Sequence, residues 1–202
     1  MLAVARICVF CASSERIAPE HVDLASRVGT AIAARGHDLV SGGGRVSMMG
    51  AVAAAVRAGG GHTLGVIPQA LVELEVADTE ADELVVTAGM RERKGRMDAA
   101  ADAFLTLPGG LGTLEELTEV WVAGTLGMHA KPIVVLDPTG LYEPLHELVR
   151  RLADEGFLHR AAGETLTWTT EVDQALDAIE AGLRAPARPA QPAADDIVES
   201  AP

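Results

Sequence analysis

Two glycine-rich segments of this sequence are the parts best suited to holding a small anion. They span residues 42–50 and 108–113, and each follows an apolar, strand-like run and opens a helical pattern. Glycine lets the backbone approach a ligand closely and turn its N–H groups inward, and the partial positive charge of a helix start favours phosphate. The sequence therefore predicts that one or both turns bind a phosphorylated ligand. A simple tight connection is the alternative for each.

Neither segment contains a standard nucleotide-binding motif. No Gly-Lys-Ser or Gly-Lys-Thr follows either turn, as it would in a Walker loop, and neither turn has the Gly-x-Gly-x-x-Gly pattern of dinucleotide-binding proteins. A mononucleotide or a sugar phosphate therefore fits these turns better than NAD or a hydrolysed nucleoside triphosphate.

Two cations lie early in a predicted helix. Arg93 and Lys94 fall near the start of a helical pattern over residues 90–100, where positive charge opposes the helix dipole. Residues that break local preferences are enriched at functional sites. Their placement favours a role in a site, with a solvated basic patch as the alternative.

Thr113 and Glu116 have two interpretations. Thr-x-x-Glu at a helix start is the capping box, in which both side chains bind only backbone N–H groups. The same carboxylate could instead serve a site, because it follows the second glycine turn. The local sequence does not separate the two.

The elements that must position these residues alternate between short β-branched runs and longer helical patterns. This alternation predicts an α/β fold with a Rossmann-like, doubly wound parallel sheet in three αβα layers, and ligands bind such sheets beyond the carboxyl ends of the strands. The predicted strands are 5–11, 38–41, 63–67, 83–87, 103–107, 132–136 and 165–168, and the predicted helices are 21–35, 47–58, 90–100, 113–126, 141–155 and 172–183.

A chain of 202 residues that is 49% hydrophobic is long enough for one sizeable core. We expect a single domain over residues 1–184 and a disordered tail, rich in Pro, Ala and Asp, over residues 185–202. The connection at 68–82 is long and acidic and includes Glu75, and loops of that length are often functional. A merely solvated loop is the alternative.

Composition argues against several partners. The net charge of −13 and the small aromatic supply (three Phe, two Trp and one Tyr) disfavour nucleic acid and anionic membranes. We see no apolar run of membrane-spanning length and no secretory leader, so a cytoplasmic location is expected.

Metal binding and redox chemistry are not expected either. Cys8 and Cys11 are three residues apart in a predicted strand, which sends them to opposite faces as buried thiols. The six histidines show no metal-ligand spacing and are interpreted as loop or helix-surface residues. We therefore predict no metal.

The charged residues and the second glycine turn together resemble a known signature. Met90-x-x-Arg93-Lys94 followed by Pro108-Gly109-Gly110-x-Gly112-Thr113-x-x-Glu116 is similar to that of the LONELY GUY family, the cytokinin riboside 5′-monophosphate phosphoribohydrolases, long mislabelled lysine decarboxylases. The resemblance runs from Val9 to Phe157. It implies a Rossmann-like homodimer that needs no cofactor. It also implies hydrolysis of the N-glycosidic bond of N6-substituted AMP, with AMP itself as a further candidate, to a free base and ribose 5-phosphate.

The same resemblance implies roles for individual residues. Arg93 and Glu116 would be catalytic. The residues implied to bind the substrate are Glu75, Met90, Lys94, Gly109, Gly110, Leu111, Gly112, Thr113, Leu114 and Glu115.

The sequence also departs from the family pattern. Ser47-Met48-Met49-Gly50 replaces a common Gly-Leu-Met-Gly, and Ala12 replaces a common glycine. Val122 stands where plant members commonly have a threonine. These departures bear on the base pocket more than on the reaction.

Cleavage of a ribosyl bond builds oxocarbenium character on the sugar, which calls for negative charge and an activated water. Glu116 could supply both, while Arg93, always charged, would orient Glu116 or the nucleotide and stabilise the leaving base.

The main alternative is a non-catalytic carrier of a nucleotide or a pterin cofactor, which would not need both of these residues. A pyridoxal phosphate enzyme would have to use Lys94 or Lys131, the only lysines. A protein scaffold has no support beyond an apolar helix face at residues 48–56, which is interpreted as core or dimer contact.

Overall fold

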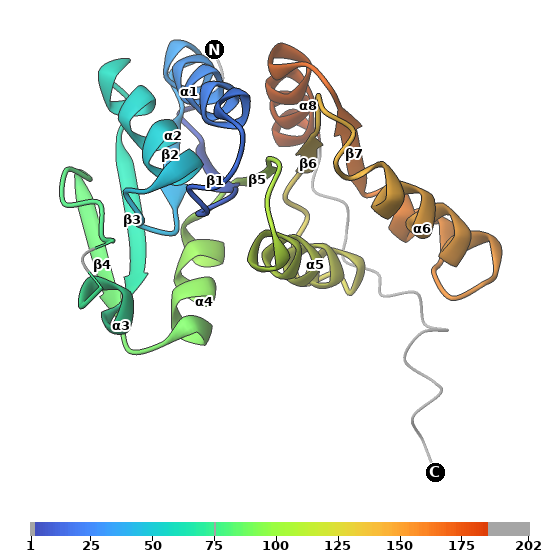
Figure 1. Ribbon diagram of the computed structural model, residues 1–202. Helices are drawn as coiled ribbons and strands as arrows, with labels where there is room; N and C mark the ends of the chain where they lie inside the picture. The colour runs from blue at the N-terminus through green and yellow to red at the C-terminus, as the bar shows by residue number, and fades with distance from the viewer. Residues whose placement is uncertain (1–2, 75, 186–202) are drawn as a thin grey trace.

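The computed structural model describes residues 3–74 and 76–185, and these form one parallel sheet in the strand order β4-β3-β2-β1-β5-β6-β7 (Figure 1). The strands are β1 (Arg6–Phe10), β2 (Asp38–Ser41), β3 (Thr63–Pro68), β4 (Glu83–Thr87), β5 (Ala103–Thr106), β6 (Ile133–Leu136) and β7 (Leu166–Thr169). Every predicted strand is present, with ends shifted by at most one residue. The predicted tail lies, apart from Ala185, outside the described residues, so the proposed domain boundary stays a prediction.

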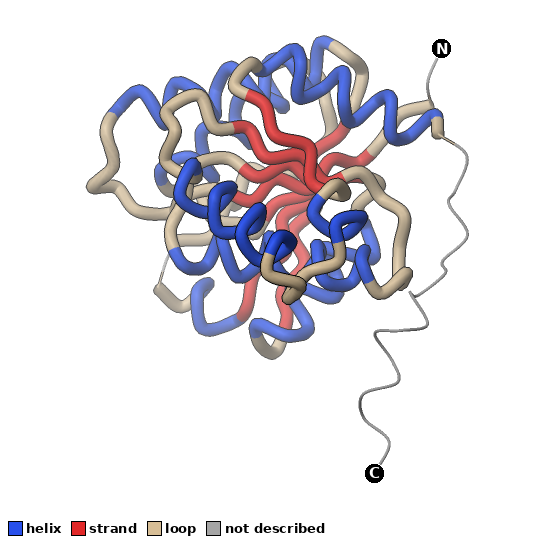
Figure 2. The backbone as a smooth tube through the Cα atoms, turned by 90° about the vertical axis from the view of Figure 1, so that its right-hand side faces the viewer, coloured by secondary structure: helices blue, strands red, loops and turns tan. Residues whose placement is uncertain are grey.

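Helices cover both faces of this sheet (Figure 2). They are α1 (Pro19–Ala34), α2 (Ser47–Ala58), α3 (Gln69–Val72), α4 (Met90–Ala100), α5 (Leu111–Thr125), α6 (Glu143–Asp154), α7 (Arg160–Gly163) and α8 (Val172–Arg184). The doubly wound, three-layer prediction is confirmed. The four-residue helices α3 and α7 were missed because one helical turn carries no readable periodicity.

Two clusters of buried side chains fill the space between the layers. The first joins one face of the sheet to α1, α2 and α8, and the second joins the other face to α4, α5 and α6. Cys11 belongs to the first cluster and Cys8 to the second, so the prediction of buried, unbridged thiols on opposite faces is confirmed. Of the apolar face at residues 48–56, Met48, Val52 and Val56 are core residues.

The two central strands, β1 and β5, create a crevice at the carboxyl edge of the sheet. β1 pairs with β2 on one side and with β5 on the other. The chain moves outward from β1 in one direction and from β5 in the other, so the loops after these strands lead to opposite faces and leave a gap between them. The N–H of Ala12 donates to the carbonyl of Pro108 at 3.2 Å and joins the two loops at their base.

The segment at 68–82 folds back over the first glycine turn. It contains α3 and makes an isolated bridge between Gly44 and Ala77. Asp78 accepts a hydrogen bond from Arg57 at 2.8 Å, and Asp82 accepts one from the Thr63 N–H at 2.8 Å. The segment is therefore anchored at several points. Glu75 itself lies outside the described residues.

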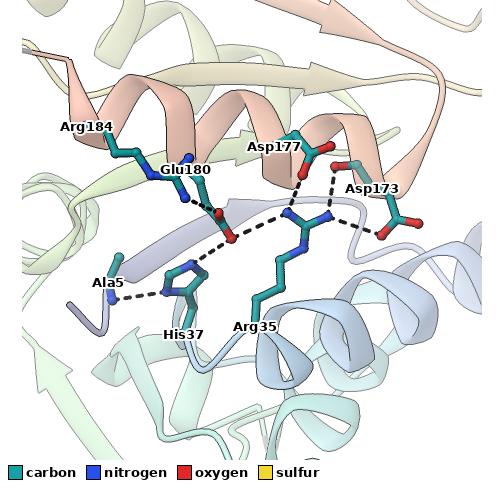
Figure 3. Close-up of polar contacts among 7 residues, drawn as sticks. All are labelled: Ala5, Arg35, His37, Asp173, Asp177, Glu180 and Arg184. Atoms are coloured by element: carbon teal, nitrogen blue, oxygen red, sulfur yellow. Dashed lines mark hydrogen bonds and ion pairs between the residues drawn. The ribbon is translucent and has the colours of Figure 1, made fainter. Parts of the chain in front are cut away.

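A polar cluster fastens the last helix to the first (Figure 3). Arg35, just after α1, donates to Asp177 at 2.6 Å, and Glu180 accepts from Arg184 at 2.8 Å. His37 lies 3.5 Å from Glu180, and its Nδ1 accepts the Ala5 N–H at 3.2 Å. His37 lies in the loop between α1 and β2, one of the two placements expected for the histidines, and it is buried there.

Within the described part of the chain, no helix is both long and apolar enough to cross a membrane.

Candidate active site

A cavity of about 800 Å³ lies beyond the carboxyl ends of β1, β2, β3 and β5. The first turns of α1, α2, α4 and α5 reach its wall, and α3 closes one side. The cavity lies where the topology of a doubly wound sheet predicts a ligand site.

A buried ion pair between Arg93 and Glu116 forms part of the wall. Arg93 Nη1 donates to Glu116 Oε1 at 2.7 Å, and Arg93 Nε donates to the Val66 carbonyl at 3.0 Å. The side chains of Arg93 and Glu116 are only 7% and 12% exposed. The guanidinium is thus fixed at two of its nitrogens and holds the carboxylate in one orientation.

The electrostatic setting of Glu116 suits a base. Burial raises the pKa of Glu116 above its usual value, and the charge and hydrogen bond of Arg93 oppose that rise. A carboxylate with a raised pKa accepts a proton more readily near neutral pH than an exposed one does.

The first glycine turn makes room for the arginine. A Cβ atom on Gly42 would lie 1.8 Å from Arg93 Nη2, closer than any two such atoms can approach. Gly43 has a φ of +70°, in the left-handed region that favours glycine. This turn therefore serves the packing of Arg93, a purpose that the sequence did not indicate.

The second glycine turn leads directly into α5. This helix begins at Leu111 with Gly110 as its N-cap, two residues earlier than predicted. Thr113 lies inside the first turn and is buried, and Glu116 binds Arg93 instead of a backbone N–H. The capping-box interpretation is therefore wrong.

Tyr142 and Asp137, which the sequence analysis missed, support the second glycine turn through hydrogen bonds. The Tyr142 hydroxyl lies 3.2 Å from the carbonyl oxygens of both Leu107 and Gly109, to which it donates. Asp137 accepts the N–H of Tyr142 at 2.6 Å. Tyr142 precedes α6 with no local motif, so only the folded structure reveals its role.

Most of the predicted site residues line the cavity. Those that do are Met90, Arg93, Gly109, Gly110, Leu111, Gly112, Thr113, Glu115 and Glu116. Leu114 instead packs against the second core cluster. The segment beside Glu75 reaches the cavity through Leu74 and Val76.

Lys94 does not line the large cavity but a second, smaller one. It pairs with Glu115 and with Glu119, the latter at 2.5 Å, and these hydrogen bonds raise its pKa above the usual value. It lines a second cavity of about 320 Å³ that shares Met97 and Glu116 with the first. Val122 also lines this second cavity, together with Leu126 and Met128.

Sequence reasoning missed several other lining residues. The polar ones are Ser13, Ser14 and His21, and apolar ones include Met49, Leu71 and Leu74. Ser13 and Ser14 could have been found, because they follow a predicted strand directly. Leu71 and Leu74 could not, because they reach the cavity through the unpredicted helix α3.

The strand order and the position of the large cavity identify the class of protein. It is a Rossmann-like α/β protein whose candidate site lies at the switch point of the sheet. A family model described as "Possible lysine decarboxylase" matches residues 49–179. The chain is 54% identical to a cytokinin riboside 5′-monophosphate phosphoribohydrolase of Mycobacterium marinum, covering 87% of this chain and 94% of the relative. A relative of the same description from Mycobacterium tuberculosis is 51% identical over 85% and 91% of the two chains. The chain therefore belongs to the LONELY GUY family, the cytokinin riboside 5′-monophosphate phosphoribohydrolases, and the resemblance is confirmed.

Solved structures share the fold at much lower identity. A molybdenum cofactor binding protein from Rippkaea orientalis has a TM-score of 0.69 at 19% identity, covering 90% of this chain and 98% of that one. A Moco carrier protein from Chlamydomonas reinhardtii has a TM-score of 0.68 at 21% identity, with the same coverage. These likenesses show the fold alone.

Proposed function

We propose that this protein hydrolyses the N-glycosidic bond of a cytokinin riboside 5′-monophosphate, releasing the free N6-substituted adenine and ribose 5-phosphate. The observation that carries the proposal is the buried Arg93–Glu116 pair, held in the cavity next to the glycine turn that opens α5. The names of the relatives at 51% and 54% identity support the same reaction.

The lining of the cavity suggests how the nucleotide lies. Backbone N–H groups at residues 110–113 begin α5 and suit the 5′-phosphate. Met49, Leu71 and Met90 line the side near α3 and suit the base with its N6 substituent. The ribose then lies between these ends, with C1′ facing Glu116.

The chemistry follows from the carboxylate. As the C1′–N9 bond lengthens, positive charge grows on the sugar, and an ionised Glu116 stabilises it. The same carboxylate accepts a proton from the water whose oxygen bonds to C1′, for which its raised pKa is suited. The electron pair of the C1′–N9 bond leaves on N9 of the base, and that nitrogen takes up a proton from solvent. Arg93 holds the carboxylate in position, and phosphate binding at the far end contributes remote binding energy to the alignment.

The alternative of a non-catalytic carrier is less well supported. It rests on fold likeness at 19–22% identity, and a carrier has no need of a buried carboxylate fixed by an arginine. The lysine decarboxylase interpretation also lacks a suitable residue. Lys94 is paired with two glutamates, and Lys131 donates to Asp98 at 2.8 Å just before β6, at the opposite end of the strands from the cavity.

Three finer features belong to this proposal. AMP is a candidate substrate beside its N6-substituted forms, the protein works in the cytoplasm, and it forms a homodimer. The exposed side chains of Val122, Leu126 and Met128 around the second cavity support the homodimer, since such a patch favours burial against another chain. No nucleic acid partner is proposed.

The test is direct. The purified protein is incubated with AMP and with N6-isopentenyl-AMP, and the released base is quantified by chromatography, with Glu116→Gln alongside. Release by the wild type but not by the folded variant is the expected result. Release at an unchanged rate by Glu116→Gln would remove the carboxylate from the mechanism. Nucleotide binding without any release by the wild type would favour the carrier.

A further inference from the structure

Three apolar residues on one side of the large cavity lie on a segment with little packing of its own. Leu71 belongs to α3, and Leu74 and Val76 follow it; we refer to these three residues as the apolar wall. None of the four residues of α3 is buried, and Leu74 is 68% exposed. Apolar burial therefore contributes little to the position of the wall, and other contacts must fix it.

Backbone hydrogen bonds join the end of this segment to the first glycine turn. The Asp78 N–H donates to the Gly43 carbonyl at 2.8 Å, and the Arg45 N–H donates to the Val76 carbonyl at 2.8 Å. An isolated antiparallel bridge lies between these two hydrogen bonds. The position of the apolar wall thus depends on how this short pairing is held in place.

A buried ion pair ties the same pairing to α2. Arg57, in the last turn of α2, donates from Nη1 to Asp78 Oδ2 at 2.8 Å and from Nη2 to Asp78 Oδ1 at 3.4 Å. The side chains of Arg57 and Asp78 are 18% and 7% exposed. Asp78 Oδ1 also accepts the Glu80 N–H at 3.2 Å. A buried ion pair adds little net stability, but it strongly favours one geometry because either charge alone is costly to bury.

Helix α2 connects this ion pair to the cavity. Met49, in the first turn of α2, lines the cavity. A Cβ on Gly44 would lie 3.2 Å from the end of Met49 and 3.8 Å from the Val76 carbonyl oxygen, so Met49 and the wall are close neighbours. Arg57 and Asp78 are not among the described residues that line the cavity. Any effect of the ion pair on a ligand therefore passes through the wall.

We propose that Arg57 and Asp78 are positioning residues, which hold the apolar wall against the base and the N6 substituent of the nucleotide. This inference rests on the proposed function for the identity and the orientation of the ligand. In that orientation the ribose 5-phosphate part lies toward the start of α5 and not against the wall. The pair should therefore contribute to affinity for the base and its apolar substituent, and leave affinity for ribose 5-phosphate unchanged.

The experiment measures binding by calorimetry with three ligands that contain no hydrolysable N-ribosyl bond. They are carbocyclic AMP, its N6-isopentenyl derivative and ribose 5-phosphate. In the carbocyclic forms a methylene group replaces the ribose ring oxygen, so no oxocarbenium ion can form and the ligands stay intact. The result therefore does not depend on turnover.

Four variants are compared with the wild type. Asp78→Asn removes the carboxylate charge at nearly constant size, Arg57→Lys keeps the positive charge, and Arg57→Gln/Asp78→Asn removes both charges together. Glu80→Gln is the matched control, because the Glu80 side chain binds the same arginine at 3.4 Å but is 82% exposed. Thermal melting checks that each variant is folded, and hydrogen exchange follows the backbone N–H groups of Arg45 and Asp78.

Asp78→Asn should weaken binding of the N6-isopentenyl ligand about tenfold and of carbocyclic AMP about threefold, and keep ribose 5-phosphate within about twofold of wild type. The double variant should lose no more than Asp78→Asn, since the two residues act as one unit. Arg57→Lys should lose less than either. The followed N–H groups should exchange faster in the variants that bind more weakly, and Glu80→Gln should match the wild type throughout.

Equal affinities of the wild type and Asp78→Asn for the N6-isopentenyl ligand would overturn the proposal. So would an equal loss for all three ligands, which would indicate a general structural role, or a loss of the same size in Glu80→Gln. If Asp78→Asn does not fold, the double variant, which leaves no unpaired charge, takes its place in each comparison.

Base release from AMP and N6-isopentenyl-AMP tests the hydrolase separately. The expected binding pattern without base release would refute the hydrolase and leave the positioning role intact. Base release combined with equal binding by the wild type and Asp78→Asn would do the reverse. A wild type that binds neither carbocyclic ligand would overturn the positioning role as well.

Discussion

Ser47 has a backbone conformation that L-residues rarely adopt. Its φ of +53° lies in the left-handed region, at the first residue of α2. Its hydroxyl donates to the Ser14 carbonyl at 2.7 Å. Glycine is common here in the family pattern that the sequence resembles, and the backbone gives the reason. Compared with glycine, serine at this position has a strained backbone but gains a hydrogen bond to the loop after β1.

Two substitutions separate these effects. Ser47→Ala loses the hydrogen bond and keeps the strain, whereas Ser47→Gly loses the hydrogen bond and removes the strain. Ser47→Gly should therefore be more stable than Ser47→Ala by about 1 kcal/mol. Urea unfolding of both variants measures the difference. Equal stabilities would mean that position 47 is not strained in solution.

Glu116 predicts the pH dependence of turnover. In its proposed role as the base Glu116 must be ionised, so activity should fall as pH drops through its pKa. Burial raises that pKa, so the acidic limb of the kcat profile should lie above the range of an exposed glutamate. The neighbouring charge of Glu115 contributes to the rise, and Glu115→Gln should move the limb to lower pH.

Glu119 offers a matched control for that experiment. It binds the same lysine as Glu115 but does not line the large cavity. Glu119→Gln should leave the acidic limb where it is in the wild type. An upward movement in Glu115→Gln, or none, would contradict the assignment of Glu116 as the titrating group.

Among the elements, the glycine turn after β2 positions Arg93, the arginine proposed to be catalytic. Gly42→Ala would place a methyl group on Arg93 Nη2, so the guanidinium must move away from Glu116. We expect kcat to fall about 100-fold, as for a catalytic group displaced by about 1 Å.

Gly44 lies in the same turn and provides the comparison. A Cβ there would meet the flexible end of Met49 at 3.2 Å and the Val76 carbonyl at an ordinary contact distance of 3.8 Å. Gly44→Ala should keep kcat within about threefold of wild type, since that methyl can shift. Equal kcat losses in the two variants would show that alanine disturbs the conformation of the turn and not the position of the Arg93 guanidinium in particular.

The sequence predicted the long elements well, because hydrophobic periodicity and glycines at helix ends mark them. Strand order rules also predicted that ligands bind at the carboxyl edge. Contacts between residues far apart in the sequence could not be predicted, because local patterns carry no information about them. Arg93 and Glu116 are 23 residues apart, and their hydrogen bond follows from how α4 and α5 pack. The packing of helices also determines the hydrogen bond from Tyr142 to the Gly109 carbonyl and the position of Lys94 in the second cavity, so neither could be predicted from the local sequence.

For the whole molecule, the exposed apolar patch predicts assembly. Val122, Leu126 and Met128 are 52%, 42% and 74% exposed and lie together around the second cavity. If two copies bury this patch, Met128→Glu should convert a dimer into monomers, since an unpaired buried charge is strongly unfavourable.

Light scattering after size-exclusion chromatography gives the mass directly. Phe157→Glu is the control, because Phe157 is 78% exposed and lies outside the second cavity. It should leave the mass at twice that of the chain. A wild type that elutes as a monomer would refute the homodimer.

The attachment of α8 to α1 also affects how the protein is made. The first core cluster contains Leu24 and Val28 of α1 together with Leu176 and Ile179 of α8, which lie about 150 residues later. During synthesis the earlier half of this cluster emerges from the ribosome long before its last members exist. Until α8 is translated, the face of α1 that it covers stays open to water, and such surfaces recruit chaperones or aggregate. Stop codons placed between residues 117 and 171 should therefore yield insoluble chains, even though both proposed catalytic residues have been translated.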